Sequence, residues 1–232
     1  METAQNFSNA TLNDWWARTG EWVEEPNQRR GGASGVQLLA PSTAQQPWLY
    51  SKRQVGHRFF SLRYPCGRPT VLREKNAMQA LERLGLKVPT LVFYGAEKQG
   101  KDWYALLVTE ALKDFISLEE WYSQLALQPV DSAVVSEVLQ AVANALTTMH
   151  KAGWQHSCCY AKHIFIKTKP AQSPEVAFLD LEKARRRWPA QGAALHDIKQ
   201  LGRHRGAMPD SDWQLFLQFY CNQNPKLRTK LA

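Results

Sequence analysis

The stretch H-S-C-C-Y-A-K-H-I-F-I, from His156 to Ile166, ends in a short apolar segment, and F-L-D-L at Phe178 to Leu181 follows it with a single carboxylate, Asp180. An aspartate at the end of an apolar strand is in many proteins only a turn former. Here it comes after a loop and a short apolar hairpin, and Mg²⁺ prefers one or two carboxylates together with phosphate oxygens. The stretch therefore predicts a hairpin, Ile164 to Ile166 and Val176 to Leu181, next to a magnesium-binding aspartate.

Helical patterns dominate the part of the chain around this hairpin. Asp131 is suited to cap a long helix that runs to His150, because aspartate oxygens accept hydrogen bonds from the free N–H groups of a first helical turn. The apolar side chains of this segment recur at helical spacing: Val134, Val138, Val142, Leu146 and Met149. Asp212 to Tyr220 is a candidate terminal helix. The second half of the chain is therefore predicted to be mostly helical.

The first half of the chain predicts strands and one helix. The helix is expected over Val71 to Leu84, where apolar residues recur at three-residue spacing and Gly85 provides a stop. The strand candidates are short apolar segments separated by polar loops: Val36 to Leu39, Trp48 to Gln54, Leu91 to Tyr94 and Tyr104 to Val108. The expected connections are turns or loops: Gln28 to Ala33, Pro41 to Pro47, Lys98 to Asp102 and Thr109 to Phe115.

This order of elements predicts an α+β protein with two lobes, because segregated strands and helices are typical of that class. The chain has 232 residues, enough for two small lobes that share an interface. We expect an N-terminal segment and β-rich N-lobe over residues 1–108, a hinge over 109–115 and a helical C-lobe over 116–232. The tryptophan-rich segment Asn13 to Val23 is expected to pack on the N-lobe.

Composition indicates the compartment and the kind of partner. The net charge is +8, which favours anionic partners such as phosphorylated sugars, an acidic membrane surface or nucleic acid. The run Arg185 to Arg187 is either a solvated loop or a phosphate-binding one. No apolar run approaches the roughly 20 residues that cross a bilayer, and the N-terminus lacks an apolar signal core. Four cysteines, two of them adjacent, suit a reducing compartment. We therefore expect a cytoplasmic protein.

Other parts suited to phosphoryl transfer occur in chain order before Asp180. A glycine-rich stretch, Gly31 to Gly35, would let backbone amides approach phosphates, although an ordinary turn explains it equally well. It lacks the G-x-x-x-x-G-K-[ST] pattern of a P-loop. Lys52 follows in a predicted strand and Glu74 near the start of the predicted helix. The order of loop, strand lysine and helix glutamate is more informative than any one member.

Several longer motifs resemble one protein family. They are W-W-x-x-x-G-E-W-V-E-E-P-N at Trp15 to Asn27, G-V-Q at Gly35 to Gln37, R-Y-P-C-G-R-P-T at Arg63 to Thr70, A-L-L-V-T-E at Ala105 to Glu110, Q-H-S-C-C-Y-A-K-H-I-F-I-K at Gln155 to Lys167, and F-L-D-L-E-K-A-R-R-R at Phe178 to Arg187. Together they span almost the whole chain. The sequence resembles the bacterial lipopolysaccharide-kinase (WaaP and Kdo kinase) superfamily.

The resemblance implies a protein kinase-like fold, with ATP and Mg as cofactors, and it implies roles for particular residues. The implied nucleotide-binding residues are Gly32 and Gly35 in the loop, Lys52 with its partner Glu74, and Glu110 and Ala111 in a hinge against adenine. The implied metal-binding residues are His163 and Asp180. His156 would be the histidine of the H-R-D catalytic loop, and Asp197 a structural aspartate in the next helix.

The sequence departs from the kinase pattern at the catalytic base. The H-R-D aspartate falls at Cys158 and the arginine at Ser157. A thiol with an unperturbed pKa of about 8.5 is a poor substitute for a carboxylate base. The base mainly positions the acceptor hydroxyl in a loose transition state, so its loss costs about 10²–10⁴-fold in rate. We therefore expect weak or no kinase activity.

Several functions remain open at this point. One is a stress-responsive pseudokinase that binds Mg-ATP. Another is an active kinase for a sugar of lipopolysaccharide or a related anionic glycan, with peripheral contact to the inner membrane surface. A third is zinc or redox chemistry at His156, Cys158, Cys159 and His163, with Lys162 lowering a thiol pKa. Nucleic-acid binding rests on charge alone and is not expected.

Overall fold

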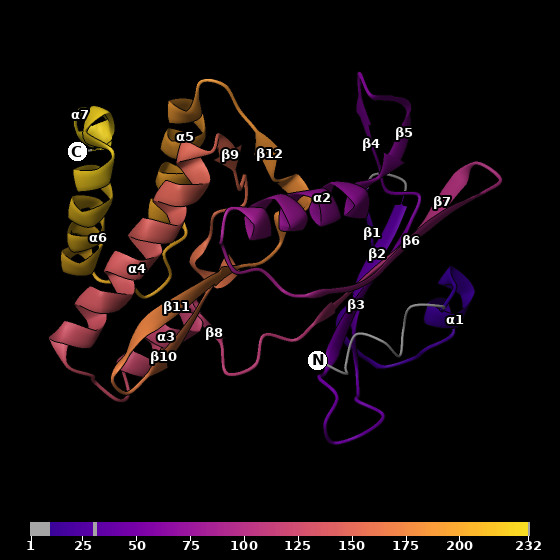
Figure 1. Ribbon diagram of the computed structural model, residues 1–232, viewed down its shortest axis with the longest axis horizontal. Helices are drawn as coiled ribbons and strands as arrows, with labels where there is room; N and C mark the ends of the chain where they lie inside the picture. Colours follow the sequence, from indigo (N-terminus) through magenta and orange to yellow (C-terminus); the bar gives the residue numbers. More distant parts are fainter. Residues whose placement is uncertain (1–9, 30–31, 232) are drawn as a thin grey trace. The chain divides into compact units, whose positions relative to one another are not determined.

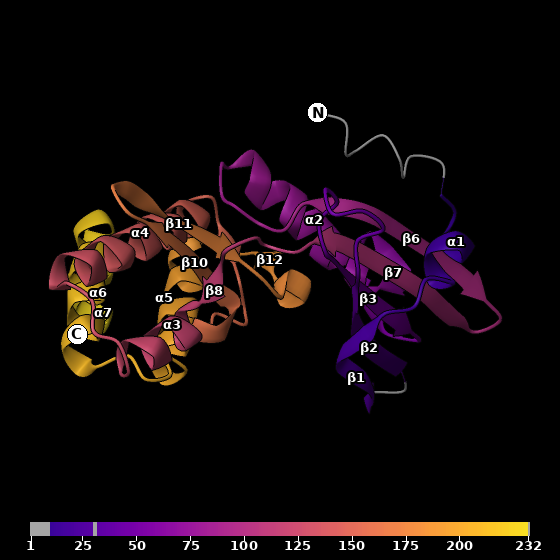
Figure 2. The same ribbon diagram turned by 90° about the horizontal axis from the view of Figure 1, so that it is seen from below.

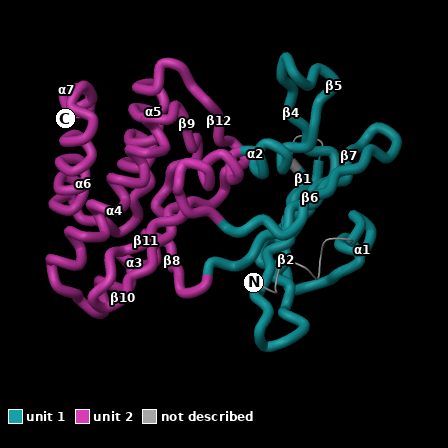
Figure 3. The backbone as a smooth tube through the Cα atoms, viewed as in Figure 1, with its two compact units in different colours: residues 1–76, 89–112 teal, residues 77–88, 113–232 magenta. Residues whose placement is uncertain are grey.

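The computed structural model describes residues 10–29 and 32–231 (Figure 1). The chain forms two compact units, which we call unit 1 and unit 2 (Figure 3). Unit 1 comprises Met1–Asn76 and Pro89–Leu112, and unit 2 comprises Ala77–Val88 and Lys113–Ala232. The hinge expected over residues 109–115 stays a prediction. No described helix is both long and apolar enough to cross a membrane.

Unit 1 is built on a five-stranded antiparallel sheet with the order β1-β2-β3-β7-β6. Its strands are β1 (Glu21–Arg29), β2 (Gly32–Leu39), β3 (Leu49–Val55), β6 (Leu91–Gln99) and β7 (Asp102–Glu110). The central strand β3 pairs with β2 on one side and β7 on the other, and Lys52 lies opposite Val36 and Leu107. The middle of the sheet therefore holds Lys52 in a fixed register.

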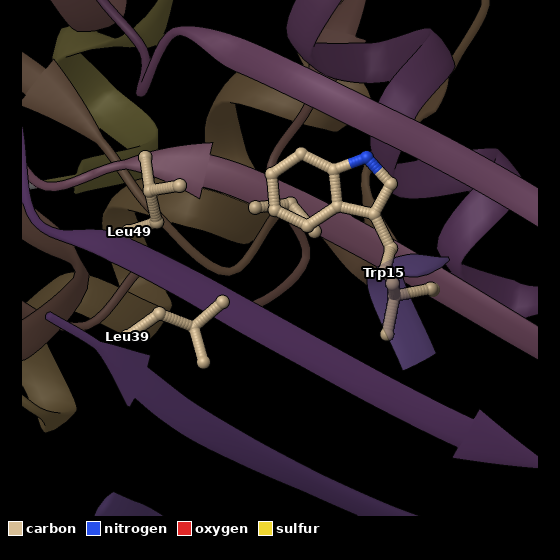
Figure 4. Close-up of a cluster of buried hydrophobic side chains, with 5 residues drawn as sticks. Trp15, Leu39 and Leu49 are labelled. Atoms are coloured by element: carbon tan, nitrogen blue, oxygen red, sulfur yellow. The ribbon is translucent and has the colours of Figure 1, made fainter. Parts of the chain in front are cut away.

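The first helix, α1 (Leu12–Trp16), packs on the apolar face of this sheet. Thr11 and Asp14 form a capping box that starts the helix. The helix carries the fully buried Trp15, whose ring stacks on Phe93 with centroids 5.5 Å apart. Trp15 belongs to an apolar cluster on the sheet (Figure 4), with Leu39, Leu49, Leu106 and Val108. The tryptophan-rich segment thus packs on unit 1 through Trp15.

A separate hairpin and a helix connect β3 to β6. The hairpin strands are β4 (Arg58–Ser61) and β5 (Tyr64–Pro69), which form a two-stranded sheet of their own. Helix α2 (Thr70–Arg83) follows directly and ends before Gly85, whose φ of +75° favours glycine. The predicted helix is therefore confirmed to within one residue at each end.

Unit 2 is mostly helical. Asp131 accepts a hydrogen bond from the Ala133 N–H at 2.9 Å and caps α4 (Ser132–Lys151), as the sequence predicted. Four of the five apolar residues on its expected face are fully buried, and Val134 is half-buried. Helix α4 packs against α5 (Ala190–Arg203) and α6 (Asp210–Gln223), as Figures 1 and 2 show.

The expected hairpin lies against α4 in unit 2 and consists of β10 (Ile164–Lys169) and β11 (Gln172–Phe178). A third short strand, β8 (Ile116–Ser117), pairs with β10. The remaining elements are α3 (Leu118–Leu125), β9 (Trp154–Gln155), β12 (Arg185–Arg186) and α7 (Arg228–Leu231).

Several sequence predictions need correction at their ends. The second hairpin strand ends at Phe178 and not at Leu181, and the turn predicted over Lys98 to Asp102 is too wide, because β6 continues to Gln99 and β7 begins at Asp102. The turn predicted over Gln28 to Ala33 is too wide, because β1 continues to Arg29 and β2 begins at Gly32, and residues 30 and 31 lie outside the described residues. The connector predicted from Thr109 is also too wide, because Thr109 and Glu110 are still paired in β7. At each of these turns and connectors, the ladder hydrogen bonds of the neighbouring strands extend the sheet past the apolar segment. The α+β fold class is confirmed.

Candidate functional site

Lys52 and Glu74 form an ion pair in unit 1. The Lys52 Nζ atom lies 2.8 Å from Glu74 Oε2, and the two side chains are 18% and 10% exposed. Strand β3 supplies the lysine and the first half of α2 supplies the glutamate. A partly buried carboxylate restricts the lysine to few rotamers, so that the position of its ammonium group is fixed.

Gln54 joins the same strand to the start of α2. Its Oε1 atom accepts hydrogen bonds from the Thr70 hydroxyl at 2.8 Å and from the Val71 N–H at 3.2 Å. Lys52 and Gln54 are two positions apart on β3, so their side chains point to the same face of the sheet. The strand therefore fixes both the beginning of α2 and the glutamate one turn further along it.

The expected phosphate-loop glycines lie in strand β2, where packing already requires glycine. A Cβ atom at Gly35 would lie 2.7 Å from the Trp22 ring, and one at Gly32 would lie 2.7 Å from the Val55 carbonyl oxygen. Both distances are too short for a real side chain. Gly31 lies outside the described residues. A phosphate-binding role for Gly32 and Gly35 stays a prediction, since sheet packing alone explains these glycines.

The expected adenine-binding residues use their N–H groups within the protein. The Glu110 N–H donates to the Thr90 carbonyl at 2.9 Å, and the Ala111 N–H donates to the Trp48 carbonyl at 2.8 Å. Neither amide hydrogen is available to adenine while these bonds last. An adenine contact at Glu110 or Ala111 would therefore have to use a carbonyl oxygen or a side chain.

In unit 2, Asp197 on α5 organises the catalytic-loop segment. Its carboxylate is fully buried and accepts hydrogen bonds from the backbone N–H groups of His156 at 2.5 Å and Ser157 at 3.0 Å. The imidazoles of His150 and His196 lie 3.3 and 3.0 Å from the same carboxylate. Burial raises the pKa of Asp197, but the hydrogen bonds and charges of these histidines outweigh burial and hold the pKa below its usual range.

His156 is enclosed on all sides. Its Nδ1 atom accepts a hydrogen bond from the Cys158 N–H at 3.3 Å, so the proton of the neutral ring is on Nε2. The ring stacks parallel to His163 with centroids 6.2 Å apart and meets Phe178 edge-on. Burial lowers the pKa of His156 to about 4, despite the nearby charge of Asp197. His156 is therefore neutral at physiological pH and supports the loop by packing.

This buried histidine predicts an acid-sensitive stability. Because the folded-state pKa of about 4 lies below the ordinary histidine value of 6.5, the unfolded chain binds the proton more readily. His156 should therefore lower the free energy of unfolding by about 2 kcal/mol between about pH 7.5 and about pH 5. Urea unfolding at both pH values should show this slope, and His156→Asn should remove it. His204→Asn, at an exposed histidine, is the control for the loss of an imidazole; an equal effect of both variants would contradict the assignment.

Cys158 is buried at the position expected for the catalytic base. Its carbonyl oxygen accepts from His163 Nδ1 at 2.8 Å, which fixes the loop around it. Burial and the negative charge of Asp180 raise the pKa of the Cys158 thiol, and Lys183 opposes them only in part. The thiol is therefore neutral at pH 7 and cannot take a proton from an acceptor hydroxyl as a carboxylate does.

Cys159 has a still more protected thiol. Its backbone N–H donates to Gln200 Oε1 at 2.7 Å, and burial raises the pKa of the thiol well above its ordinary value. Reactive cysteines need a lowered pKa and access to solvent. Across residues 10–29 and 32–231, no three His, Cys, Asp or Glu side chains are grouped to hold a metal ion. The raised pKa of the Cys159 thiol is the opposite of what a thiol sensor requires, and zinc binding stays an untested alternative.

His163 and Asp180 face one another beside the hairpin. The distance from His163 Nε2 to Asp180 Oδ2 is 3.7 Å. Since His163 Nδ1 donates to a carbonyl oxygen, the neutral ring presents a lone pair at Nε2 toward the carboxylate. The Nε2 lone pair and the carboxylate are both hydrogen-bond acceptors, and they repel each other unless a proton or a cation lies near both. One carboxylate that is 39% exposed also suits Mg²⁺, which takes its other oxygens from phosphates and water.

Sequence reasoning missed two residues of these sites. Gln54 could have been found from its spacing, since it follows Lys52 by two positions in a predicted strand. Lys183 follows Asp180 closely in D-L-E-K, and only the fold shows that it acts on the Cys158 thiol. The structure brings Lys52 together with Glu74 in unit 1. It brings His156, Cys158, His163 and Asp180 together in unit 2.

Comparisons with known proteins agree with this architecture. The profile of the lipopolysaccharide kinase (Kdo/WaaP) family matches residues 13–220. Protein InaA of Escherichia coli K12 is 46% identical over 209 residues, which cover 90% of this chain and 94% of InaA. The lipopolysaccharide core heptose(I) kinase WaaP of Pseudomonas aeruginosa is 30% identical over 126 residues, 50% of this chain and 46% of WaaP.

A solved structure described as WaaP in complex with acyl carrier protein has the same fold. It aligns with a TM-score of 0.68 at 20% identity and covers 94% of this chain and 86% of the WaaP chain. The kinase-like α+β fold expected from the sequence is thereby confirmed, and so is the resemblance to the lipopolysaccharide-kinase superfamily. The chain belongs to the lipopolysaccharide kinase (Kdo/WaaP) family.

Proposed function

We propose that this chain is an InaA-like pseudokinase that binds Mg-ATP and transfers its phosphate slowly or not at all. The observation that carries the nucleotide-binding part is the Lys52–Glu74 ion pair, with 2.8 Å between its charged atoms. A lysine steadied by a glutamate is what ATP phosphates require in kinase-like proteins. A cytoplasmic location belongs to the same proposal, because ATP is available in the cytoplasm. The stress-responsive role expected from the sequence is kept as part of this proposal.

Different residues of the chain would bind the phosphates, bind the magnesium ion and support the loop. Lys52 holds phosphate oxygens and Glu74 keeps the lysine extended. Asp180 and His163 hold magnesium, which supplies charge neutralisation at the phosphates when bound. Asp197 keeps the segment from His156 to Cys158 in place through the backbone. Each of these roles needs only the positions and charges of the side chains, and none needs a base.

The absence of efficient catalysis follows from Cys158. A base in this reaction orients the acceptor hydroxyl and takes its proton late. The Cys158 thiol has a raised pKa and is buried, so it offers neither a negative charge nor a strong acceptor. We therefore propose that nucleotide binding, more than turnover, is the activity of this protein.

Calorimetry with Mg-ATP tests the proposal directly. Wild-type protein should bind, and Lys52→Ala should weaken the affinity by about 10- to 100-fold, the usual value of a hydrogen bond to a charged group. Lys87→Ala is a matched control, because Lys87 also pairs with a glutamate, Glu175, but on an exposed surface of unit 2. Absence of binding by the wild-type protein would refute both the pseudokinase and the kinase hypotheses.

A second candidate function is an active kinase for an anionic glycan. The match to WaaP, described as a lipopolysaccharide core heptose(I) kinase, favours it, and the net charge of +8 suits a lipopolysaccharide precursor. Such an enzyme would contact the inner membrane peripherally. Transfer of labelled phosphate to a heptose-containing core glycan, abolished by Asp180→Asn, would establish this function in place of the first.

A further inference from the structure

The hairpin β4–β5 exposes two large apolar side chains to water. Phe60 is 63% exposed and Leu62, in the turn between the strands, is 104% exposed. The hairpin is a separate two-stranded sheet and stands out from the rest of unit 1 in Figures 1 and 3. A single exposed apolar residue is ordinary on a protein surface. Two at the end of a projecting hairpin form a small apolar tip.

The charges around this tip all have one sign. Residues 57–73 contain four arginines, Arg58, Arg63, Arg68 and Arg73, and neither aspartate nor glutamate. The first three are exposed. The Arg58 guanidinium lies 5.9 Å from the Phe60 ring centre, and that of Arg63 lies 5.6 Å from Tyr64. Arginines beside the apolar tip therefore form a basic collar around it, and no acidic residue of the segment neutralises them.

The hairpin has its own support, so the exposure of its tip does not reflect a poorly packed loop. Phe59 and Tyr64 pack edge-on with ring centres 5.9 Å apart. Arg68 stacks over Trp103 of β7 at 4.9 Å. Gly67, with a φ of +79°, lets the chain pass close to the Phe60 ring. These contacts hold the aromatic side chains of the hairpin base while Phe60 and Leu62 stay in water.

We propose that the β4–β5 tip docks on an anionic lipid bilayer. Phe60 and Leu62 enter the boundary between headgroups and acyl chains, and Arg58, Arg63 and Arg68 pair with lipid phosphates. Apolar side chains flanked by cations are the combination that binds the membrane interface. A bilayer fits this tip better than an acidic protein does, because a convex turn with a fully exposed leucine can insert among lipids without a matching pocket. The proposal does not depend on nucleotide binding.

Vesicle sedimentation gives the first test. The full chain should sediment with vesicles of phosphatidylethanolamine and phosphatidylglycerol and should not sediment with phosphatidylcholine alone. Phe60→Ser combined with Leu62→Ser should weaken binding at least about tenfold through lost apolar burial. Arg58→Gln combined with Arg63→Gln should weaken it by about 25-fold, about fivefold for each charge. All four residues are solvent-facing, so these variants should fold normally.

Leu127→Ser is the matched control. Leu127 is 84% exposed, comparable to Phe60, but residues 114–150 around it contain no lysine or arginine. Its removal should leave vesicle binding unchanged. If Leu127→Ser weakens binding as much as the hairpin variants do, or if the wild-type chain ignores anionic vesicles, the proposal is wrong.

A label at Cys66 separates insertion from simple adsorption. Cys66 on β5 is exposed, whereas Cys158, Cys159 and Cys221 are buried, so a thiol-reactive, environment-sensitive dye should react selectively with Cys66. Anionic vesicles should shift the dye emission to the blue and shield it from an aqueous quencher. Binding without any change at the dye would overturn the proposal. So would binding that depends on the arginines and not on Phe60 and Leu62, because charge alone would then hold the protein on the membrane.

Discussion

Replacing Asp197 by alanine is expected to destabilise unit 2 by about 3–5 kcal/mol, the cost of breaking a buried, charged hydrogen-bond network. The carboxylate is fully buried and accepts the backbone N–H groups of His156 and Ser157. Without it, two N–H groups and the imidazole of His150 would stay in the interior with no acceptor. The catalytic-loop segment would lose the interaction that places it.

Urea unfolding of Asp197→Ala and the wild-type protein measures this effect. Asp210→Asn is the control, because its carboxylate is 88% exposed and pairs with Arg205 at the surface, so the loss of its charge should cost less than about 1 kcal/mol. The pKa of Asp197 is lowered in the folded state. Its contribution to the free energy of unfolding should therefore be fully present above the pKa of the unfolded state, and it should be lost as the pH falls through the pKa of the folded state. A loss as small as that of the control would show that the network is not a structural anchor.

Replacing Cys158 by aspartate is expected to raise phosphoryl transfer by about 10²–10⁴-fold, the usual contribution of a positioned base. The wild-type thiol is neutral because burial and the charge of Asp180 raise its pKa. An aspartate at the same place has a much lower intrinsic pKa, and Lys183 favours its charged form. The new carboxylate would then orient an acceptor hydroxyl or a water molecule.

ATP hydrolysis and transfer to a core glycan, measured at saturating Mg-ATP, provide the readout. Cys158→Ser changes the size of the side chain little and adds no charge, so it should leave the rate at the wild-type level. Adding Asp180→Asn to Cys158→Asp should abolish the gain. A folded Cys158→Asp protein that binds Mg-ATP but turns over no faster would show that something other than the missing base limits this family member.

The parts of the fold that could be predicted are those with a strong local pattern. Helix α4 has both a cap at Asp131 and an apolar face sustained over its length, and both agree with the structure. The hairpin β6–β7 has two apolar runs on either side of Gly100, whose φ of +61° suits a tight turn. In each case the residues that define the element are close in sequence, so no distant contact is needed to find it.

The missed elements lack such a pattern. Strand β1 contains Pro26 and a run of exposed polar residues, and it forms only because β2 offers it a ladder at the edge of the sheet. The hairpin β4–β5 is short and carries four arginines with its neighbours, which a periodicity search treats as surface loop. The family resemblance places a helix around Asp197, but no local signal marks its start, since α5 begins after Pro189 without a side-chain cap. Tertiary contacts decide all three.

The sequence was enough to predict which residues belong to the candidate site. It was not enough to predict their burial, their charged neighbours or their hydrogen bonds. Chain order and family resemblance pointed to Lys52, Glu74, His163 and Asp180. The neutral state of Cys158 depends on burial and on charges brought from other loops, which no local pattern contains. The hydrogen bonds that occupy the N–H groups of Glu110 and Ala111 also come from distant residues, Thr90 and Trp48.

The hydrogen bonds of Gln54 bear on how this protein is controlled. In regulated protein kinases, activation depends on moving the helix that carries the glutamate toward or away from the lysine. Here a movement of α2 away from β3 would break the hydrogen bonds that the Thr70 hydroxyl and the Val71 N–H donate to Gln54 Oε1. Gln54 lies on the same strand as Lys52. A movement of α2 away from Lys52 is therefore disfavoured, because it would break both of these hydrogen bonds.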